Sequence, residues 1–147
     1  MGKPFFTYLS YTTPHLPLSA SNFHRNLMEK AHGGSGDRLL TFAAIRQTDN
    51  EISRLVAKLK TLERETVILF HSDNGGTSSG CNFPYKGGKQ WLTEGGTLSP
   101  AFVYKTHSVQ QVKRSNEMMH ITDWFPTLLK FAGLPIPTGL RLDKLEN

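Results

Sequence analysis

The chain has 147 residues, of which 37% are hydrophobic and 20% are charged. This length and composition fit one globular domain and exclude a chain that is disordered throughout. The formal net charge of +5 favours an anionic partner, but the basic residues are scattered and match no nucleic-acid-binding module, so we expect no nucleic-acid partner.

The single cysteine and the hydropathy pattern exclude further classes. Cys81 is the only cysteine, which rules out an internal disulfide and a cysteine-rich zinc site. No stretch has the apolar length of a membrane span, and the amino terminus has no signal-peptide pattern. We therefore expect neither feature in this chain.

The first half of the chain predicts a strand followed by a long helix. A short aromatic strand is expected over residues 5–11, ended by the proline-rich loop 12–17, and a polar, irregular stretch follows up to Gly36. Residues 37–64 predict an amphipathic helix, because apolar side chains recur at spacings of three, four and seven: Ile45, Ile52, Leu55, Val56, Leu59 and Leu62.

The second half predicts two more strands and a helix. Residues 66–71 are long enough for one buried strand, and residues 101–104 give another after a glycine-rich loop. Asp123 is expected to cap a helix that continues to Ala132 and ends at Gly133. This order of elements favours an α/β fold with a largely parallel sheet.

The polar residues directly after the central strand form the first candidate site. Asp73 offers a carboxylate and Asn74 an amide oxygen, and Ca²⁺ or Mg²⁺ accepts both as ligands. Gly75 and Gly76 allow the backbone turn that lets both side chains reach one ion. The alternative is an Asx turn that closes a strand, which is the commoner role of an isolated Asp-Asn-Gly.

Two further residues join this candidate site. His15 follows the predicted amino-terminal strand, and Lys89 follows Gly87-Gly88 in the glycine-rich loop. Considered singly, His15 fits a solvent-facing loop histidine and Lys89 fits a surface cation. His120 and Asp123 are expected to serve the start of the last helix and not the site.

Together, five motifs resemble the sulfatase family, and most closely its arylsulfatase B group within the alkaline-phosphatase-like superfamily. They occur in the family's order over nearly the whole chain: Pro4-Phe5-Phe6 with Pro14-His15-Leu16-Pro17, residues 72–76, Gly87-Gly88-Lys89, Trp91 with Glu94-Gly95-Gly96, and residues 120–127. The resemblance implies a partial α/β/α sandwich of the alkaline-phosphatase-like fold. Residues 1–147 would then form the second half of a sulfatase catalytic domain.

The resemblance also implies the activity of a sulfuric ester hydrolase and a role for each candidate. Asp73 and Asn74 match the second pair of ligands to one calcium ion. Lys89 and His15 match the catalytic, substrate-binding residues that contact the sulfate group, with His15 able to protonate the leaving oxygen. A divalent ion and fixed cations stabilise the charge of a sulfate ester as the S–O bond breaks. The implied substrate is a sulfated small molecule or glycan, and the implied location is lysosomal or secreted.

The departures from the family pattern concern the nucleophile. The family's formylglycine arises within Cys/Ser-x-Pro-x-Arg, which these 147 residues lack. Cys81 has its proline at the wrong spacing, and we interpret it as a structural loop thiol. We therefore expect this chain alone to be inactive toward sulfate esters. The alternative function is a non-catalytic module that binds an anion or a protein partner and retains part of the fold.

Two physical expectations follow from the incomplete pattern. Asp73 and Asn74 supply about three of the ~6–8 oxygens that Ca²⁺ takes, so calcium binding by this chain should be weak. Open sheet edges and apolar faces should also make the chain marginally stable or prone to associate. A complementary amino-terminal segment or a second copy of the chain is the expected partner.

Overall fold

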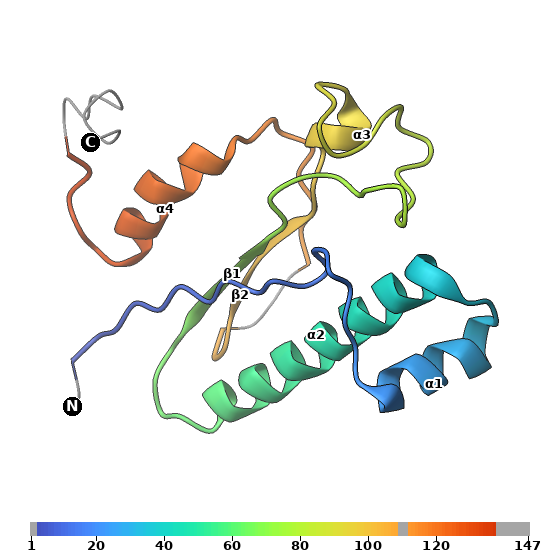
Figure 1. The fold of residues 1–147 in the computed structure, drawn as a ribbon. Coiled ribbons are helices and arrows are strands. Elements are labelled where there is room, and N and C mark those ends of the chain that lie inside the picture. The colour runs from blue at the N-terminus through green and yellow to red at the C-terminus, as the bar shows by residue number, and fades with distance from the viewer. Residues whose placement is uncertain (1–2, 109–111, 138–147) are drawn as a thin grey trace.

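The computed structural model describes residues 3–108 and 112–137. The elements are, in order, α1 (Asn22–His32), α2 (Gly36–Lys60), β1 (Val67–His71), α3 (Glu94–Thr97), β2 (Ala101–Lys105), the 3₁₀ turn η1 (Ile121–Asp123) and α4 (Trp124–Phe131). Helices α1 and α2 form a hairpin, and the two strands lie between this hairpin and α4 (Figure 1). Among the described residues, no helix has the length and apolarity that crossing a membrane requires.

Helix α1 lies in the stretch for which we predicted irregular structure, so that prediction is wrong. The Ser21 hydroxyl caps the helix by accepting the N–H of His24 at 3.4 Å, and Lys30 and His32 lie in its last turn. Gly33, with φ of +64°, ends the helix. These are ordinary start and stop signals, which the low apolar content of the segment obscures.

Helix α2 confirms the predicted helix but ends at Lys60 rather than Arg64. Its buried side chains are Leu39, Thr41, Ala43 and Ala44, not those of the predicted apolar stripe, in which Ile45 is exposed. The N–H of Thr61 bonds to the carbonyl of Lys58 at 3.1 Å, and the Thr61 hydroxyl donates to that carbonyl at 2.8 Å. The tighter bonding pattern of this turn closes the helix.

Strands β1 and β2 confirm the predicted positions, but the expected parallel arrangement is wrong for the described residues. The two strands pair antiparallel, with Phe70 opposite Phe102, and the two rings stack with centroids 5.1 Å apart. A parallel pair needs a crossover connection, usually a long helix. The connection here carries only the one-turn helix α3, so the chain returns beside β1 in the opposite direction.

The strand predicted over residues 5–11 does not form in the structure. The segment is extended, but it pairs with neither β1 nor β2, which make up the sheet of the described residues. Phe6 and Tyr8 leave 73% and 74% of their surface exposed. A favourable strand sequence forms a strand only where a neighbour accepts its hydrogen bonds and side chains.

Helix α4 confirms the last predicted helix, although its cap differs from the prediction. The N–H of His120 donates to the Asp123 carboxylate at 2.8 Å, and the N–H of Thr122 donates to His120 Nδ1 at 3.4 Å. This reciprocal capping box precedes η1, and the Asp123 side chain does not cap α4 itself. His120 and Asp123 therefore serve the helix start, as expected.

Burial among the described residues concentrates on the first half of α2. Leu39, Ala43 and Ala44 are the buried hydrophobic side chains, and Thr41 on the same helix is also buried. The hydroxyls of Thr41 and Ser79 are hydrogen-bonded at 3.0 Å, and Ala44 lines a cavity with residues 12–19. Helix α2 is thus the support on which the loops with the candidate residues rest.

Candidate functional site

The candidate site centres on the glycine-rich loop, residues 72–99, which joins β1 to β2. The two ends of the loop are hydrogen-bonded to each other, because the N–H of Ser72 donates to the carbonyl of Pro100 at 3.0 Å. The Ser99 hydroxyl donates to the Ser72 carbonyl at 2.9 Å and reinforces this closure. Asp73 and Asn74 therefore lie just beyond the carboxyl end of β1, at the neck of the loop.

A backbone turn follows β1, as the sequence predicts. The Ser72 hydroxyl donates to the carbonyl of Asn74 at 3.1 Å, which holds the chain in a turn. Asp73 is exposed and Asn74 is half-buried. In a straight strand, neighbouring side chains point to opposite faces, and the turn releases Asp73 and Asn74 from this alternation.

Hydrogen bonds between backbone groups fold the loop onto itself. The N–H of Gly75 donates to the carbonyl of Gly96 at 2.9 Å, and the N–H of Gly95 donates to the carbonyl of Lys86 at 3.0 Å. The N–H of Lys89 donates to the carbonyl of Gly76 at 3.1 Å. Lys89 is thereby held beside the turn that carries Asp73 and Asn74.

Glycine is required where these segments meet. A Cβ added to Gly88 would lie 2.6 Å from the carbonyl oxygen of Gly76. Added Cβ atoms at Gly75, Gly95 and Gly96 would likewise overlap backbone atoms of facing segments. The backbones therefore approach more closely than side chains permit, which explains the density of glycine in this loop.

Asn82 joins two parts of the loop through its side chain. Its Oδ1 accepts the N–H of Gly76 at 2.8 Å, and its Nδ2 donates to the carbonyls of Gly76 and Gly87 at 2.9 Å and 3.1 Å. Our sequence reasoning missed this residue. The available signal is a carboxamide inside a glycine-rich stretch, where such a side chain commonly satisfies backbone groups.

The side chains of the three candidates in the loop are available to a ligand. In residues 3–108 and 112–137, the side chains of Asp73, Asn74 and Lys89 form no hydrogen bond or ion pair with another protein group. Lys89 and Asn74 are half-buried. A partly buried ammonium or amide gains free energy from a polar partner, which an anion or a cation could supply here.

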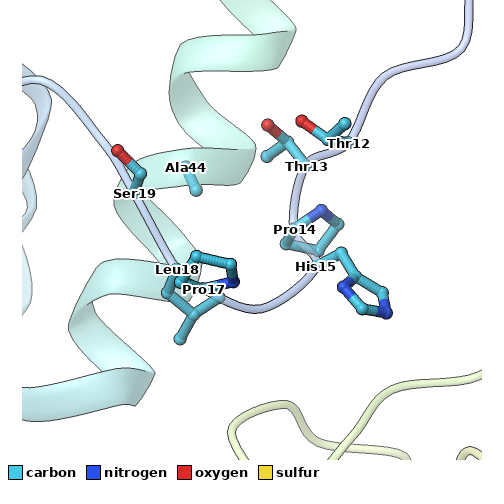
Figure 2. A pocket seen from close by; sticks show the side chains of 8 residues that line it. All are labelled: Thr12, Thr13, Pro14, His15, Pro17, Leu18, Ser19 and Ala44. Carbon is cyan, nitrogen blue, oxygen red and sulfur yellow. The ribbon is translucent and has the colours of Figure 1, made fainter.

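His15 lies in a separate turn with a defined ring orientation. Its N–H donates to the carbonyl of Thr12 at 2.8 Å, and its Nδ1 lies 2.8 Å from the carbonyl oxygen of Leu16. Because a carbonyl only accepts, Nδ1 carries the hydrogen and Nε2 remains for a ligand. The imidazole points away from Ala44 and helix α2 (Figure 2).

A cavity of about 50 Å³ lies beside His15. It is lined by Thr12, Thr13, Pro14, His15, Pro17, Leu18, Ser19 and Ala44. This volume suits a few water molecules, whereas pockets for small organic ligands reach about 300–1,000 Å³. Within the described residues, this cavity is therefore sized for water rather than for an organic ligand.

The structure places three of the four predicted residues in one loop and the fourth in a separate segment. Asp73, Asn74 and Lys89 share the hydrogen-bonded glycine-rich loop. His15 is linked to them through α2, since Ala44 lies beside its loop and Thr41, one helical turn earlier, bonds to Ser79. Over the described ranges, no hydrogen bond joins His15 to the other three residues.

The donor chemistry of Asp73 and Asn74 fits calcium, which prefers carboxylate and amide oxygens. No group of three or more His, Cys, Asp or Glu side chains in the described residues is arranged to hold a metal ion. Asp73 and Asn74 would therefore supply only part of a calcium shell. Cys81, a free and exposed thiol, lies beside Asn82 in the loop.

Comparisons with known proteins agree with this arrangement of motifs. The sulfatase family model matches residues 2–134. Arylsulfatase J of Mus musculus is 31% identical over 96% of this chain and 24% of its own length. The uncharacterized sulfatase YdeN of Escherichia coli strain K12 is 30% identical over 97% of this chain and 26% of its own length. Steryl-sulfatase of Homo sapiens is 30% identical over 95% of this chain and 25% of its own length.

These matches define a family of sulfate ester hydrolases. The chain belongs to the sulfatase family, which confirms the resemblance carried by its five motifs and implies the alkaline-phosphatase-like fold. It spans about a quarter of the length of the curated relatives that it matches.

Proposed function

We propose that this chain contributes the sulfate-binding part of an arylsulfatase-type sulfuric ester hydrolase. The observation that carries the proposal is the 3.1 Å hydrogen bond from the N–H of Lys89 to the carbonyl of Gly76. It holds the backbone of the half-buried Lys89 beside Gly76, two residues after Asn74, which supports a site where an anion and a metal ion could lie together. The family match and the names of the relatives support the same chemistry.

Each candidate residue has a distinct role in this proposal. The ammonium of Lys89 binds sulfate oxygens, and Asp73 with Asn74 holds one calcium ion. The calcium ion, when bound, supplies positive charge to the sulfate group. His15 presents Nε2, which in the protonated ring donates a proton to the leaving oxygen as the S–O bond breaks.

The nucleophile motif Cys/Ser-x-Pro-x-Arg is not among these 147 residues. We therefore propose that the residues of this chain bind the sulfate group and protonate the leaving group, and that the chain alone does not turn over sulfate esters. A sulfated small molecule or glycan is the proposed substrate class.

A titration with inorganic sulfate, followed by the amide resonances of the 147-residue chain, tests this proposal. The amides of Gly88 and Lys89 should shift on addition of sulfate. Lys89→Met should weaken binding about tenfold, because a charge-assisted contact is lost. The matched control is Lys86→Met, which removes the same charge from an exposed position in the same loop and should leave the affinity within about twofold.

Two results would overturn the assignment of sulfate binding to Lys89. One is the absence of any sulfate-dependent shift in the loop. The other is equal weakening by Lys86→Met and Lys89→Met, which would indicate attraction to a general basic surface.

Calcium binding is tested separately by calorimetric titration with calcium chloride. Two ligands provide about three of the ~6–8 oxygens that the ion takes, so we expect a Kd of about 1 mM or weaker. Asp73→Asn should remove the remaining heat signal, whereas Asp49→Asn, on the exposed surface of α2, should not change it. Micromolar binding by the unmodified chain would contradict a site that this chain fills only in part.

A further inference from the structure

The carboxamide of Asn82 satisfies both backbone groups of Gly76. It accepts the N–H of Gly76 at 2.8 Å and donates to its carbonyl at 2.9 Å. This is the pairing that a neighbouring strand would give. The second hydrogen on Nδ2 goes to the carbonyl of Gly87 at 3.1 Å, so both donors of the carboxamide are used.

These bonds act on both sides of the candidate site. Gly76 lies two residues after Asn74, and Gly87 lies two residues before Lys89. The carbonyl of Gly76 accepts from Asn82 Nδ2 and also from the N–H of Lys89 at 3.1 Å, so both of its lone pairs are occupied. Asn82 thus fixes the carbonyl to which the backbone of Lys89 is bonded.

Little else in the described structure holds Lys89. The Lys89 side chain has no protein partner in the described residues, so the position of the Lys89 backbone sets the direction in which this side chain extends. The packing around Asn82 is close, since a Cβ on Gly88 would lie 3.0 Å from Asn82 Nδ2 and one on Gly76 would lie 3.0 Å from Asn82 Oδ1. A shift of the carboxamide therefore moves both glycine segments.

We propose that Asn82 is a positioning residue, which directs the Lys89 ammonium toward an anion bound beside the Asp73–Asn74 turn. This inference rests on the proposed sulfate-binding function of the loop. Asn82 itself does not touch the anion and acts through Gly76 and Gly87.

The test uses two variants of Asn82 in the full chain. Asn82→Ala removes all three hydrogen bonds. Asn82→Asp keeps the shape and an acceptor for the N–H of Gly76, but it loses both donors and places one carboxylate oxygen against two carbonyls. It therefore tests the donors if Asn82→Ala fails to fold, and the exchange rate at Lys89 separates their loss from repulsion between the added charge and sulfate.

The matched control is Asn50→Ala. Asn50 is also half-buried, and its Nδ2 lies 2.9 Å from His24 Nε2, joining α2 to α1 away from the loop. The control removes a carboxamide hydrogen bond between two segments of the chain without altering the glycine-rich loop.

Two readouts are measured for each variant: the Kd of inorganic sulfate and the exchange rate of the Lys89 amide hydrogen. We expect both Asn82 variants to weaken sulfate binding about tenfold and to speed exchange at Lys89 by about tenfold or more. We expect Asn50→Ala to leave both the Kd of sulfate and the exchange rate at Lys89 within about twofold, because its hydrogen bond joins α2 to α1 away from the loop.

The outcomes separate this inference from the proposed function. If the unmodified chain shows no sulfate-dependent shift, the proposed function fails, and the inference about anion positioning falls with it. If the unmodified chain binds sulfate but the Asn82 variants bind equally well, only the inference fails. Equal weakening by Asn50→Ala, or unchanged exchange at Lys89 in both Asn82 variants, would also overturn it.

Discussion

The glycine-rich loop and the amino-terminal segment, residues 3–20, each carry predicted site residues, but they are held in different ways. The loop is bonded to itself at several points, through Gly75 and Gly96, Lys86 and Gly95, and Gly76 and Lys89. Residues 5–11 of the amino-terminal segment have neither strand nor helix structure and carry exposed aromatic side chains. The glycine-rich loop therefore keeps its geometry through its own hydrogen bonds, whereas the amino-terminal segment needs another surface to fix its conformation.

This difference bears on the proposed site. Asp73, Asn74 and Lys89 belong to this loop, so hydrogen bonds hold the backbone from which the proposed ligands of the metal ion and the anion extend. His15 belongs to the other segment and is fixed by its own turn and by the contact with α2. His15, the proposed proton donor, is therefore the candidate whose final position depends most on what packs against the chain.

The largest expected effect comes from filling the space between the facing backbones of the loop. Gly75→Ala places a Cβ against the carbonyl of Gly95, and we expect it to destabilise the loop by about 3 kcal/mol or more. The free energy of loop opening is measured from hydrogen exchange at the Lys89 and Gly95 amides. Gly80→Ala is the control, because its nearest contacts would be 3.4 Å, and it should cost about 0.5–1 kcal/mol or less. Equal effects of the two variants would show that the loop is not closely packed.

The next expected effect is a contrast in amide exchange within the unmodified chain. The amides of Gly75, Lys89 and Gly95 donate to backbone carbonyls, and we expect about 100-fold protection relative to a free chain. The amides of residues 5–11 should exchange within about threefold of the free-chain rate. Amide exchange followed by nuclear magnetic resonance measures both sets at once. Comparable protection in the two regions would contradict the distinction between them.

The fold could be predicted from the sequence where local signals decide it. Apolar periodicity predicts α2, and β-branched runs predict β1 and β2, because each pattern matches one backbone geometry. The strand over residues 5–11 and the parallel sheet could not be predicted correctly, because both depend on which neighbour is present. Helix α1 was missed although Phe23, Leu27 and Ala31 recur every four residues, because the segment is short and mostly polar.

The candidate site was partly predictable for a similar reason. The closeness of Lys89 to the Asp73–Asn74 turn follows from short sequence separation and a loop rich in glycine. Asn82 was not predictable, because a carboxamide can bond to many backbone groups and only the folded loop decides which ones it meets. The partial calcium shell stays a prediction, which rests on counting the oxygen ligands of Asp73 and Asn74.

A smaller effect is expected where the glycine-rich loop rests on α2. Thr41→Val keeps the side-chain shape but removes the hydroxyl that bonds to Ser79 at 3.0 Å and, within α2, to the carbonyl of Asp37 at 2.8 Å. The two losses together should cost about 1–2 kcal/mol. Thr48→Val is the control on the same helix, half-buried and without a hydrogen bond from its hydroxyl in the described structure, and it should cost about 0.5 kcal/mol or less. The loss should appear in the exchange rates of the loop amides. If only global unfolding changes, the contact does not support the loop specifically.

The smallest effect on stability is expected in the amino-terminal segment. The double variant Phe6→Ser, Tyr8→Ser replaces two side chains that leave 73% and 74% of their surface exposed, so the free energy of unfolding should change by about 0.5 kcal/mol or less. Self-association should decrease, because apolar side chains in an extended segment favour contact with a second copy. Denaturant titration and sedimentation velocity measure the two quantities separately.

The control for this variant is Phe70→Ser in β1, where the ring stacks on Phe102 at 5.1 Å. It should cost about 2–3 kcal/mol, because a half-buried aromatic contact between the strands is lost. If the double variant destabilises the chain as much as Phe70→Ser does, the amino-terminal segment packs in solution against a surface of its own chain. His15 would then be held as firmly as Lys89. If instead association falls and stability stays, the aromatic side chains serve a contact with another surface, and His15 reaches its final position only when that contact forms.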